Sequence, residues 1–259
     1  MDYSLIDNSS LLQFLFYPRP EHSDPPENAF DMMVPVEEGV EVHCRGYWAQ
    51  EDSPWLLYFH GNGEVVSDYD FFAPYYREAG LNLLVADYRG YGKSTGSPTF
   101  GRIVADAPMI LEAAEKELTR RELLQDRLWV MGRSLGSICA LELADRCAHQ
   151  LQGLIIESGF LSIVRLIRHL GLPSPGDLNE LEAEARKKVS RITLPTLVIH
   201  GERDQLVPLE QGEELYRALA SEQKKLFTIP LADHNNIFFV ETENYLEEIR
   251  KMVLGGKNR

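Results

Sequence analysis

Residues 127–144 read RLWVMGRSLGSICALELA, an apolar run that is interrupted by a serine between two glycines and followed by small and apolar residues. A short, continuous apolar run is typical of a strand buried on both faces, and the small residues after it predict a helix. Ser134 therefore stands between strand and helix, with Gly132 two residues before it and Gly136 two residues after it. Such a junction is either a tight turn or a place where a nucleophile is held out for reaction.

Apolar runs of the same kind recur at WLLYF (55–59), NLLVAD (82–87), LQGLIIE (151–157), TLVIH (196–200) and KLFTI (225–229). Before them, two strand-like runs joined at Glu37–Gly39 predict an antiparallel hairpin. Helix-like segments lie between the runs, at 65–79, 103–118, 136–147, 210–220 and 243–254. This alternation predicts an α/β fold, with a mostly parallel central sheet of about eight strands and helices on both faces.

The length of 259 residues suits one large domain over residues 1–259. The Pro-rich segment within residues 1–30 is expected to be an irregular lead-in, and residues 158–193, after the sixth strand, a small cap insertion. In the first half of that insertion, apolar residues recur at helical spacing: Phe160, Leu161, Val164, Ile167 and Leu170. Such a stripe more often packs into a core than lines a substrate groove.

The chain is acidic, with 26 Lys and Arg against 40 Asp and Glu, a formal net charge of −14. This balance argues against nucleic acid as a partner and against electrostatic docking on anionic membranes. The apolar segment LLQFLFY (11–17) is too short to span a bilayer, so no stable membrane insertion is expected. The N-terminus lacks a basic signal-peptide region, and Cys44, Cys139 and Cys147 lack metal-ligand spacing, which together favour a reducing, cytoplasmic location. The sequence does not indicate an oligomeric state.

Most of the unusual polar chemistry follows the predicted strands: HGNG (60–63), YRGYGKS (88–94), GERDQLVP (201–208) and PLADHNN (230–236). In sheets of this kind the active crevice lies at the carboxyl ends of the strands. The G-x-S-x-G pattern alone occurs by chance in roughly one chain of this length in ten. Because the pattern here also stands between a predicted strand and a predicted helix, Ser134 is a stronger candidate nucleophile than the pattern alone would make it.

A serine hydroxyl needs a base to take its proton, so a histidine must lie within reach of Ser134. We expect this base to be His234, in the loop after the last strand. The other histidines are placed less favourably: His22 in the lead-in, His43 in the hairpin, His149 and His169 on helical segments, and His60 and His200 at strand ends before glycine, where they are expected to hold the backbone.

The histidine in turn needs an acid to fix its tautomer. Asp204, in the loop after TLVIH, is the expected acid, with Glu202 and Glu157 as its nearest rivals. The resulting chain order of Ser134, Asp204 and His234 is the serine–acid–histidine order of the α/β hydrolases.

The motifs HGNG, DYRGYGKSTGSPT (87–99), GRSLGS (132–137), HGERDQLVP (200–208) and ADHNN (232–236) together resemble an α/β-hydrolase-fold serine hydrolase. The resemblance extends over residues 55–240 and points to the abhydrolase-domain branch, which includes serine aminopeptidase-like proteins, acylglycerol lipases and protein depalmitoylases. Many relatives have glycine just before the histidine, whereas Asp233 stands there in this chain and is expected to face solvent. Membrane-bound relatives carry an N-terminal anchor, and this chain has only LLQFLFY in its place.

The resemblance implies a role for each matching residue. Ser134 would be the nucleophile, His234 the general base and then acid, and Asp204 the orienting acid. The backbone N–H groups of Leu135 and Asn62 would form the oxyanion hole. No metal or organic cofactor is expected.

The expected reaction is hydrolysis of a carboxylic ester in a small-molecule or acyl-bearing substrate, through an acyl-enzyme. Thioester cleavage, as by a depalmitoylase, and peptide hydrolysis are alternatives on the same fold. An acyltransferase and a non-catalytic binding protein are alternatives of another class. The small cap predicts a fairly open site and a modest acyl group.

Overall fold

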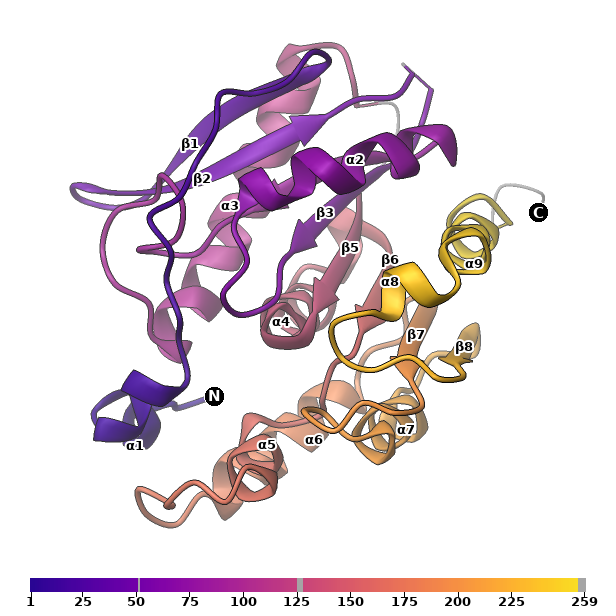
Figure 1. Ribbon diagram of the computed structural model, residues 1–259. Coiled ribbons are helices and arrows are strands. Elements are labelled where there is room, and N and C mark those ends of the chain that lie inside the picture. The colour runs from indigo at the N-terminus through magenta and orange to yellow at the C-terminus, as the bar shows by residue number, and fades with distance from the viewer. Residues whose placement is uncertain (51, 125–127, 256–259) are drawn as a thin grey trace.

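The computed structural model describes residues 1–50, 52–124 and 128–255, so Arg127, the first residue of the strand predicted at 127–131, lies outside the described residues. The described residues form one sheet of eight strands in the order β1-β2-β4-β3-β5-β6-β7-β8 (Figure 1). The strands are β1 (Ala29–Glu37), β2 (Val40–Tyr47), β3 (Trp55–Phe59), β4 (Asn82–Ala86), β5 (Leu128–Arg133), β6 (Leu151–Glu157), β7 (Thr196–Gly201) and β8 (Lys224–Ile229).

The sheet is antiparallel at one end and parallel over the rest. β1 pairs with β2 and β2 with β4 in the antiparallel sense, and every pair from β4 through to β8 is parallel. In register, Phe59 of β3 lies beside Gly132 of β5, and Gly132 lies beside Ile156 of β6. The carboxyl ends of β3, β5, β6, β7 and β8 therefore meet at one edge of the sheet, as the sequence predicts.

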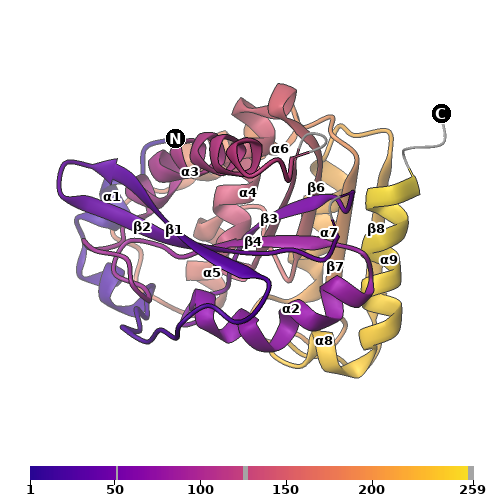
Figure 2. The same ribbon diagram turned by 90° about the horizontal axis from the view of Figure 1, so that it is seen from above.

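Helices cover both faces of the sheet (Figure 2). One face carries α2 (Tyr69–Glu78), α8 (Ile237–Val240) and α9 (Thr242–Gly255). The other carries α1 (Ser4–Asp7), α3 (Phe100–Arg120), α4 (Ser137–Arg146), α5 (Ile163–His169), α6 (Asn179–Val189) and α7 (Leu209–Ala218). None of the helices among the described residues combines the length and the apolar character needed to cross a bilayer.

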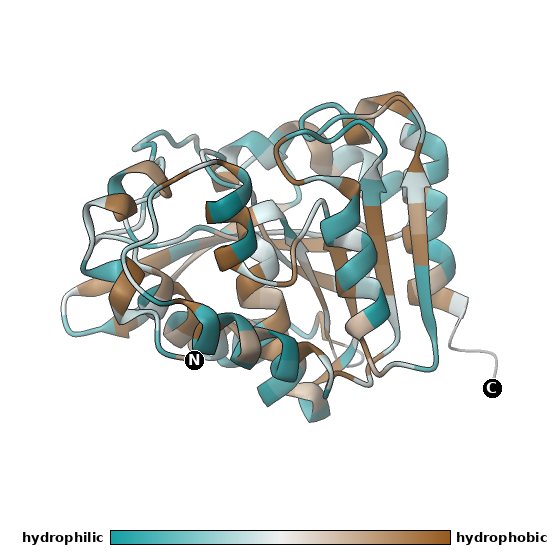
Figure 3. Ribbon diagram, turned by 90° about the horizontal axis from the view of Figure 1, so that it is seen from below, coloured by the Kyte–Doolittle hydropathy of each residue, from teal (hydrophilic) through white to brown (hydrophobic). Residues whose placement is uncertain are grey.

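The strands alternate their side chains between two apolar cores. In β3, Leu57 and Phe59 lie in the core beneath α3 and α4, whereas Leu56 and Tyr58 lie in the core beneath α2 and α9. In Figure 3 the strands are mostly apolar, and the helices around them carry both apolar and polar residues. Because both faces are covered, the central strands read as continuous apolar runs.

The predicted α/β architecture is confirmed, and so is the hairpin, which turns at Glu38 and Gly39 between β1 and β2. The five predicted helical segments correspond to α2, α3, α4, α7 and α9. The insertion at 158–193 contains α5 and α6, and Val164 and Ile167 of its apolar stripe are buried in the core, whereas Leu170 is exposed.

The expectation of an irregular lead-in over residues 1–30 is wrong for its first half. This segment contains α1 and a 3₁₀ helix over Ser10–Phe14, which Ser9 caps by accepting a hydrogen bond from the Leu11 N–H. Apolar side chains of the segment, including Ile6, are buried in the core, and this burial stabilises helices too short to form alone.

Helix α4 lies unusually close to the sheet at its N-terminal end. A Cβ atom added at Gly136 would overlap the carbonyl oxygen of Phe59 in β3, and one added at Gly132 would overlap the carbonyl of Gly136. Both obstacles are backbone atoms, which a rotamer change cannot move. Glycine is therefore needed at both positions, because a side chain there would collide with the neighbouring backbone.

We predict that Gly136→Ala lowers the free energy of unfolding by about 1–3 kcal/mol, the usual range for overpacking. Gly255→Ala is the matched control, because a Cβ atom there meets nothing within 4 Å; it should change stability by less than about 0.5 kcal/mol. Urea unfolding of the two variants measures both values. Equal stabilities for the two variants would show that α4 can move away from β3 at little cost.

Candidate active site

Ser134 lies at the end of β5, where the chain turns into α4. Its φ of +49° places it in the left-handed region, which residues other than glycine rarely adopt. The Ser137 hydroxyl donates to the Ser134 carbonyl at 2.6 Å and fixes the first turn of the helix. Only 7% of Ser134 is exposed, so most of its surface is shielded from solvent.

His234 lies between Ser134 and Asp204. Its Nε2 is 3.0 Å from the Ser134 Oγ, and its Nδ1 is 2.7 Å from the Asp204 Oδ2. A carboxylate only accepts hydrogen bonds, so Nδ1 carries the proton and Nε2 presents its lone pair to the serine hydroxyl. The structure thus brings together the three residues that the sequence predicts as nucleophile, base and acid.

The Asp204 carboxylate is fixed by its own loop. Its Oδ1 accepts hydrogen bonds from the N–H groups of Leu206 at 3.0 Å and Val207 at 2.8 Å. His200 donates from Nε2 to the Val207 carbonyl at 2.8 Å and so holds the same loop. Burial alone raises the pKa of Asp204, but the hydrogen bond and charge of His234 and the N–H of Val207 bring it below its ordinary value.

The rival acids are engaged by other side chains. Glu202 accepts a hydrogen bond from the Thr228 hydroxyl at 2.9 Å, and Glu157 pairs with Arg133. His60 holds the backbone as expected, since its Nδ1 donates to the Gly61 carbonyl at 2.8 Å. Asp233 is exposed and accepts hydrogen bonds from two N–H groups of its own loop.

The HGNG loop follows β3, the strand next to β5, and therefore lies beside Ser134. Leu135, the residue after the serine, begins the turn into α4 and is buried. The Asn62 side chain is held in place: its Oδ1 accepts from the Tyr91 hydroxyl at 2.7 Å, and its Nδ2 donates to the Leu15 carbonyl at 3.2 Å. The side chain of Asn62, whose N–H is the second predicted oxyanion donor, is thus held by Tyr91 and by Leu15.

Part of this anchoring comes from the N-terminal segment, which sequence reasoning did not connect with the site. The Tyr17 N–H donates to the Asn62 Oδ1 at 3.0 Å, and Arg19 donates to the Gly63 carbonyl at 2.9 Å. These contacts join residues more than 40 positions apart, so the local sequence around Tyr17 or Arg19 does not predict them.

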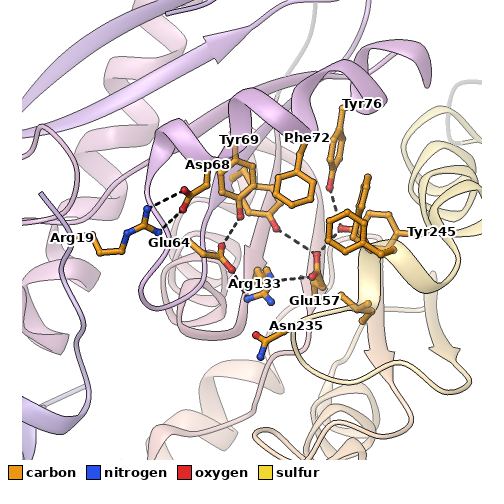
Figure 4. Close-up of a pocket in the computed structure, with 14 residues that line it drawn as sticks. Arg19, Glu64, Asp68, Tyr69, Phe72, Tyr76, Arg133, Glu157, Asn235 and Tyr245 are labelled. Atoms are coloured by element: carbon orange, nitrogen blue, oxygen red, sulfur yellow. Dashed lines mark hydrogen bonds and ion pairs between the residues drawn. The ribbon is translucent and has the colours of Figure 1, made fainter. Parts of the chain in front are cut away.

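A cavity of about 280 Å³ lies between α2 and the loop that leads into α8 (Figure 4). Its lining includes Arg133 and Asn235, the chain neighbours of Ser134 and His234. Half of its lining residues are aromatic, among them Tyr69, Phe72 and Tyr245. Its polar lining includes the ion pairs of Arg133 with Glu64 and Glu157. Sequence reasoning assigned no function to Arg133 or Glu64, although Arg133 lies within the GRSLGS motif and Glu64 directly follows HGNG.

The fold and the serine at the strand–helix turn define the class: this is an α/β-hydrolase serine hydrolase. The sequence profile described as serine aminopeptidase, S33, matches residues 50–175 and 176–241. The chain belongs to this family.

Similar proteins come from Schizosaccharomyces pombe and Escherichia coli. Protein bem46 of Schizosaccharomyces pombe is 30% identical over 194 residues, which cover 72% of this chain and 63% of bem46. The uncharacterized protein YfhR of Escherichia coli K12 is 27% identical over 185 residues, which cover 71% of this chain and 63% of YfhR. The matched region is thus less than two thirds of the length of these curated relatives.

Solved structures show the same fold. The esterase Pf2001 of Pyrococcus furiosus superposes with a TM-score of 0.72 at 19% identity, over 92% of this chain and 98% of the esterase. At this identity the likeness concerns the fold.

The lowered pKa of Asp204 predicts a pH dependence of stability. An acid whose pKa is depressed in the folded state stabilises the fold above its unfolded pKa, about 3.9, and loses this contribution as pH falls through the folded value. The difference in unfolding free energy between wild type and Asp204→Asn should shrink as the pH falls below the unfolded pKa and through the lowered folded pKa of Asp204. Chemical denaturation at each pH measures it, and a difference that grows on acidification would contradict the assignment.

Proposed function

We propose that the chain hydrolyses a carboxylic ester through an acyl-enzyme on Ser134. The observation that carries the proposal is the pair of hydrogen-bond distances at His234, 3.0 Å to the Ser134 hydroxyl and 2.7 Å to the Asp204 carboxylate. This arrangement lets one imidazole withdraw the serine proton while the carboxylate stabilises the resulting charge. The left-handed backbone of Ser134 supports the same role, because strained residues of this kind cluster at active sites.

In the first half of the reaction, the Ser134 Oγ attacks the ester carbonyl carbon as its proton passes to the His234 Nε2. The carbonyl oxygen becomes an oxyanion, which the N–H groups of Leu135 and Asn62 would bind. When the intermediate collapses, the bond to the alcohol oxygen breaks, and His234 gives its proton to that oxygen. The alcohol leaves, and the acyl group remains on Ser134.

In the second half, water attacks the acyl-enzyme while His234 takes one of its protons. The bond between the Ser134 Oγ and the acyl carbon then breaks, and His234 returns the proton to the serine. The Asp204 carboxylate stabilises the imidazolium that forms in each half. The products are a carboxylic acid and an alcohol.

An ester is proposed ahead of a thioester or an amide, in keeping with the esterase among the solved structures of this fold. The substrate is a small molecule or an acyl-bearing molecule. A reducing compartment, the cytoplasm, is proposed as its location, and this is supported by the free thiols of the three cysteines.

We predict that Ser134→Ala abolishes labelling by a fluorophosphonate and lowers kcat for an ester by a factor on the order of 10⁶. The matched control is Ser158→Ala, because Ser158 also ends a strand, has a φ of +46° and is fully buried. This control should keep labelling and turnover. Labelling that survives Ser134→Ala would refute the nucleophile assignment.

Assays of the unlabelled wild type separate the alternatives. A panel of matched ester, thioester and peptide amide substrates ranks the leaving groups. Addition of an alcohol or an amine that diverts the acyl group into a new product would indicate an acyltransferase. A wild type that neither labels nor turns over any member of the panel would favour a binding protein.

The acyl chain is predicted to be of modest length, because only the two short helices α5 and α6 follow β6 before the next strand. Short- and medium-chain esters should therefore be hydrolysed with a higher kcat/KM than long-chain esters. A series of p-nitrophenyl esters measures this dependence. Hydrolysis of long-chain esters without hydrolysis of short-chain esters would contradict this prediction.

A further inference from the structure

Arg133, the residue immediately before the serine, contacts three other parts of the chain. Its guanidinium donates from Nη2 to the His234 carbonyl oxygen at 2.7 Å. Its Nη1 is 2.7 Å from the Glu64 Oε1, and its Nε is 3.1 Å from the Glu157 Oε1. Its side chain is only 12% exposed, so solvent weakens these contacts little.

Glu64 carries the connection on to the HGNG loop. Its Oε2 accepts a hydrogen bond from the Gly61 N–H at 2.9 Å and another from the Tyr69 hydroxyl at 2.8 Å. Gly61 lies so close to the Arg133 guanidinium that a Cβ atom there would overlap it. The backbone that leads into Asn62 therefore rests directly on the arginine.

Glu157 holds the other side of the guanidinium. It ends β6, is almost fully buried and accepts a hydrogen bond from the Tyr245 hydroxyl of α9 at 2.5 Å. Figure 4 shows Arg133 between the two carboxylates at the edge of the cavity. Burial alone lowers the pKa of Arg133, but Glu64 and Glu157 raise it above its ordinary value, so the guanidinium stays charged.

We propose that Arg133 is a positioning residue that sets the Ser134 hydroxyl, the His234 imidazole and the Asn62 N–H in one geometry. This inference rests on the proposed function. The serine turn, the HGNG loop and the His234 loop come from distant parts of the chain. Arg133 directly precedes the serine and contacts the His234 carbonyl and Glu64. Its guanidinium can do so because it is one rigid, planar group that donates in three directions. A reaction that depends on contacts of about 3 Å loses on the order of 10² in rate when groups shift by about 1 Å.

The test compares Arg133→Met and Arg133→Lys with wild type. The measured quantities are the second-order rate constant of fluorophosphonate labelling and the kcat and KM for an ester. Arg133→Met should lower the labelling rate constant and kcat by about 10²-fold and leave KM within about threefold, because positioning acts on the reaction and not on binding. Arg133→Lys keeps the charge and one of the three contacts, so its rates should fall between those of wild type and Arg133→Met.

A purely structural role is separated by two further variants. Arg89→Met removes another buried arginine, whose partners Asp106 and Glu37 belong to α3 and β1 and not to the serine or histidine loop. It should lose thermal stability and keep the labelling rate constant of wild type. The triple variant Arg133→Met, Glu64→Gln, Glu157→Gln removes all three charges, so it leaves no carboxylate buried without a partner if Arg133→Met alone fails to fold. Its labelling rate constant and kcat should stay low, because the hydrogen bond to the His234 carbonyl is still lost.

Wild-type labelling rates in folded Arg133→Met, or in the triple variant, would overturn the inference while the proposed function stands. A KM that rises with kcat unchanged would also overturn it, since Arg133 would then act in binding. A wild type that does not label at Ser134 would overturn the proposed function and this inference together.

Discussion

The close approach of α4 to the sheet is the constraint on which the site depends. Gly132 and Gly136 allow the chain to reverse from β5 into the helix so sharply that Ser134 is forced to a φ of +49°. The hydroxyl is thereby held above the sheet edge, at the N-terminal end of a helix whose dipole favours negative charge. Because β3 lies beside β5, the same approach places the HGNG loop next to the serine.

Parallel strands account for the meeting of residues that lie far apart in the chain. Ser134, Asp204 and His234 follow β5, β7 and β8, and the intervening β6 separates the serine from the acid. The histidine loop spans this gap, since its imidazole reaches the serine on one side and the carboxylate on the other. The Asp204 loop uses two of its own N–H groups to hold the carboxylate, so the orientation of the imidazole is determined locally.

Much of this arrangement could be predicted from the sequence, because it follows from local patterns. Doubly buried strands read as apolar runs, and polar motifs after them must share an edge when the strands are parallel. The contacts of Arg133 could not be predicted in this way. Its partners Glu64, Glu157 and His234 meet only through the three-dimensional direction of side chains, which periodicity does not contain. The lead-in was misjudged for a similar reason, since burial in the core, and not local propensity, stabilises its short helices.

The central claim is that a covalent acyl intermediate forms on Ser134, and rapid-quench mass spectrometry with an activated ester tests it most directly. The account predicts a transient mass increase equal to the acyl group, on the peptide that contains Ser134. The adduct should form within the first turnover and disappear as the substrate is consumed. Hydrolysis without any adduct, or an adduct on another residue, would contradict the account.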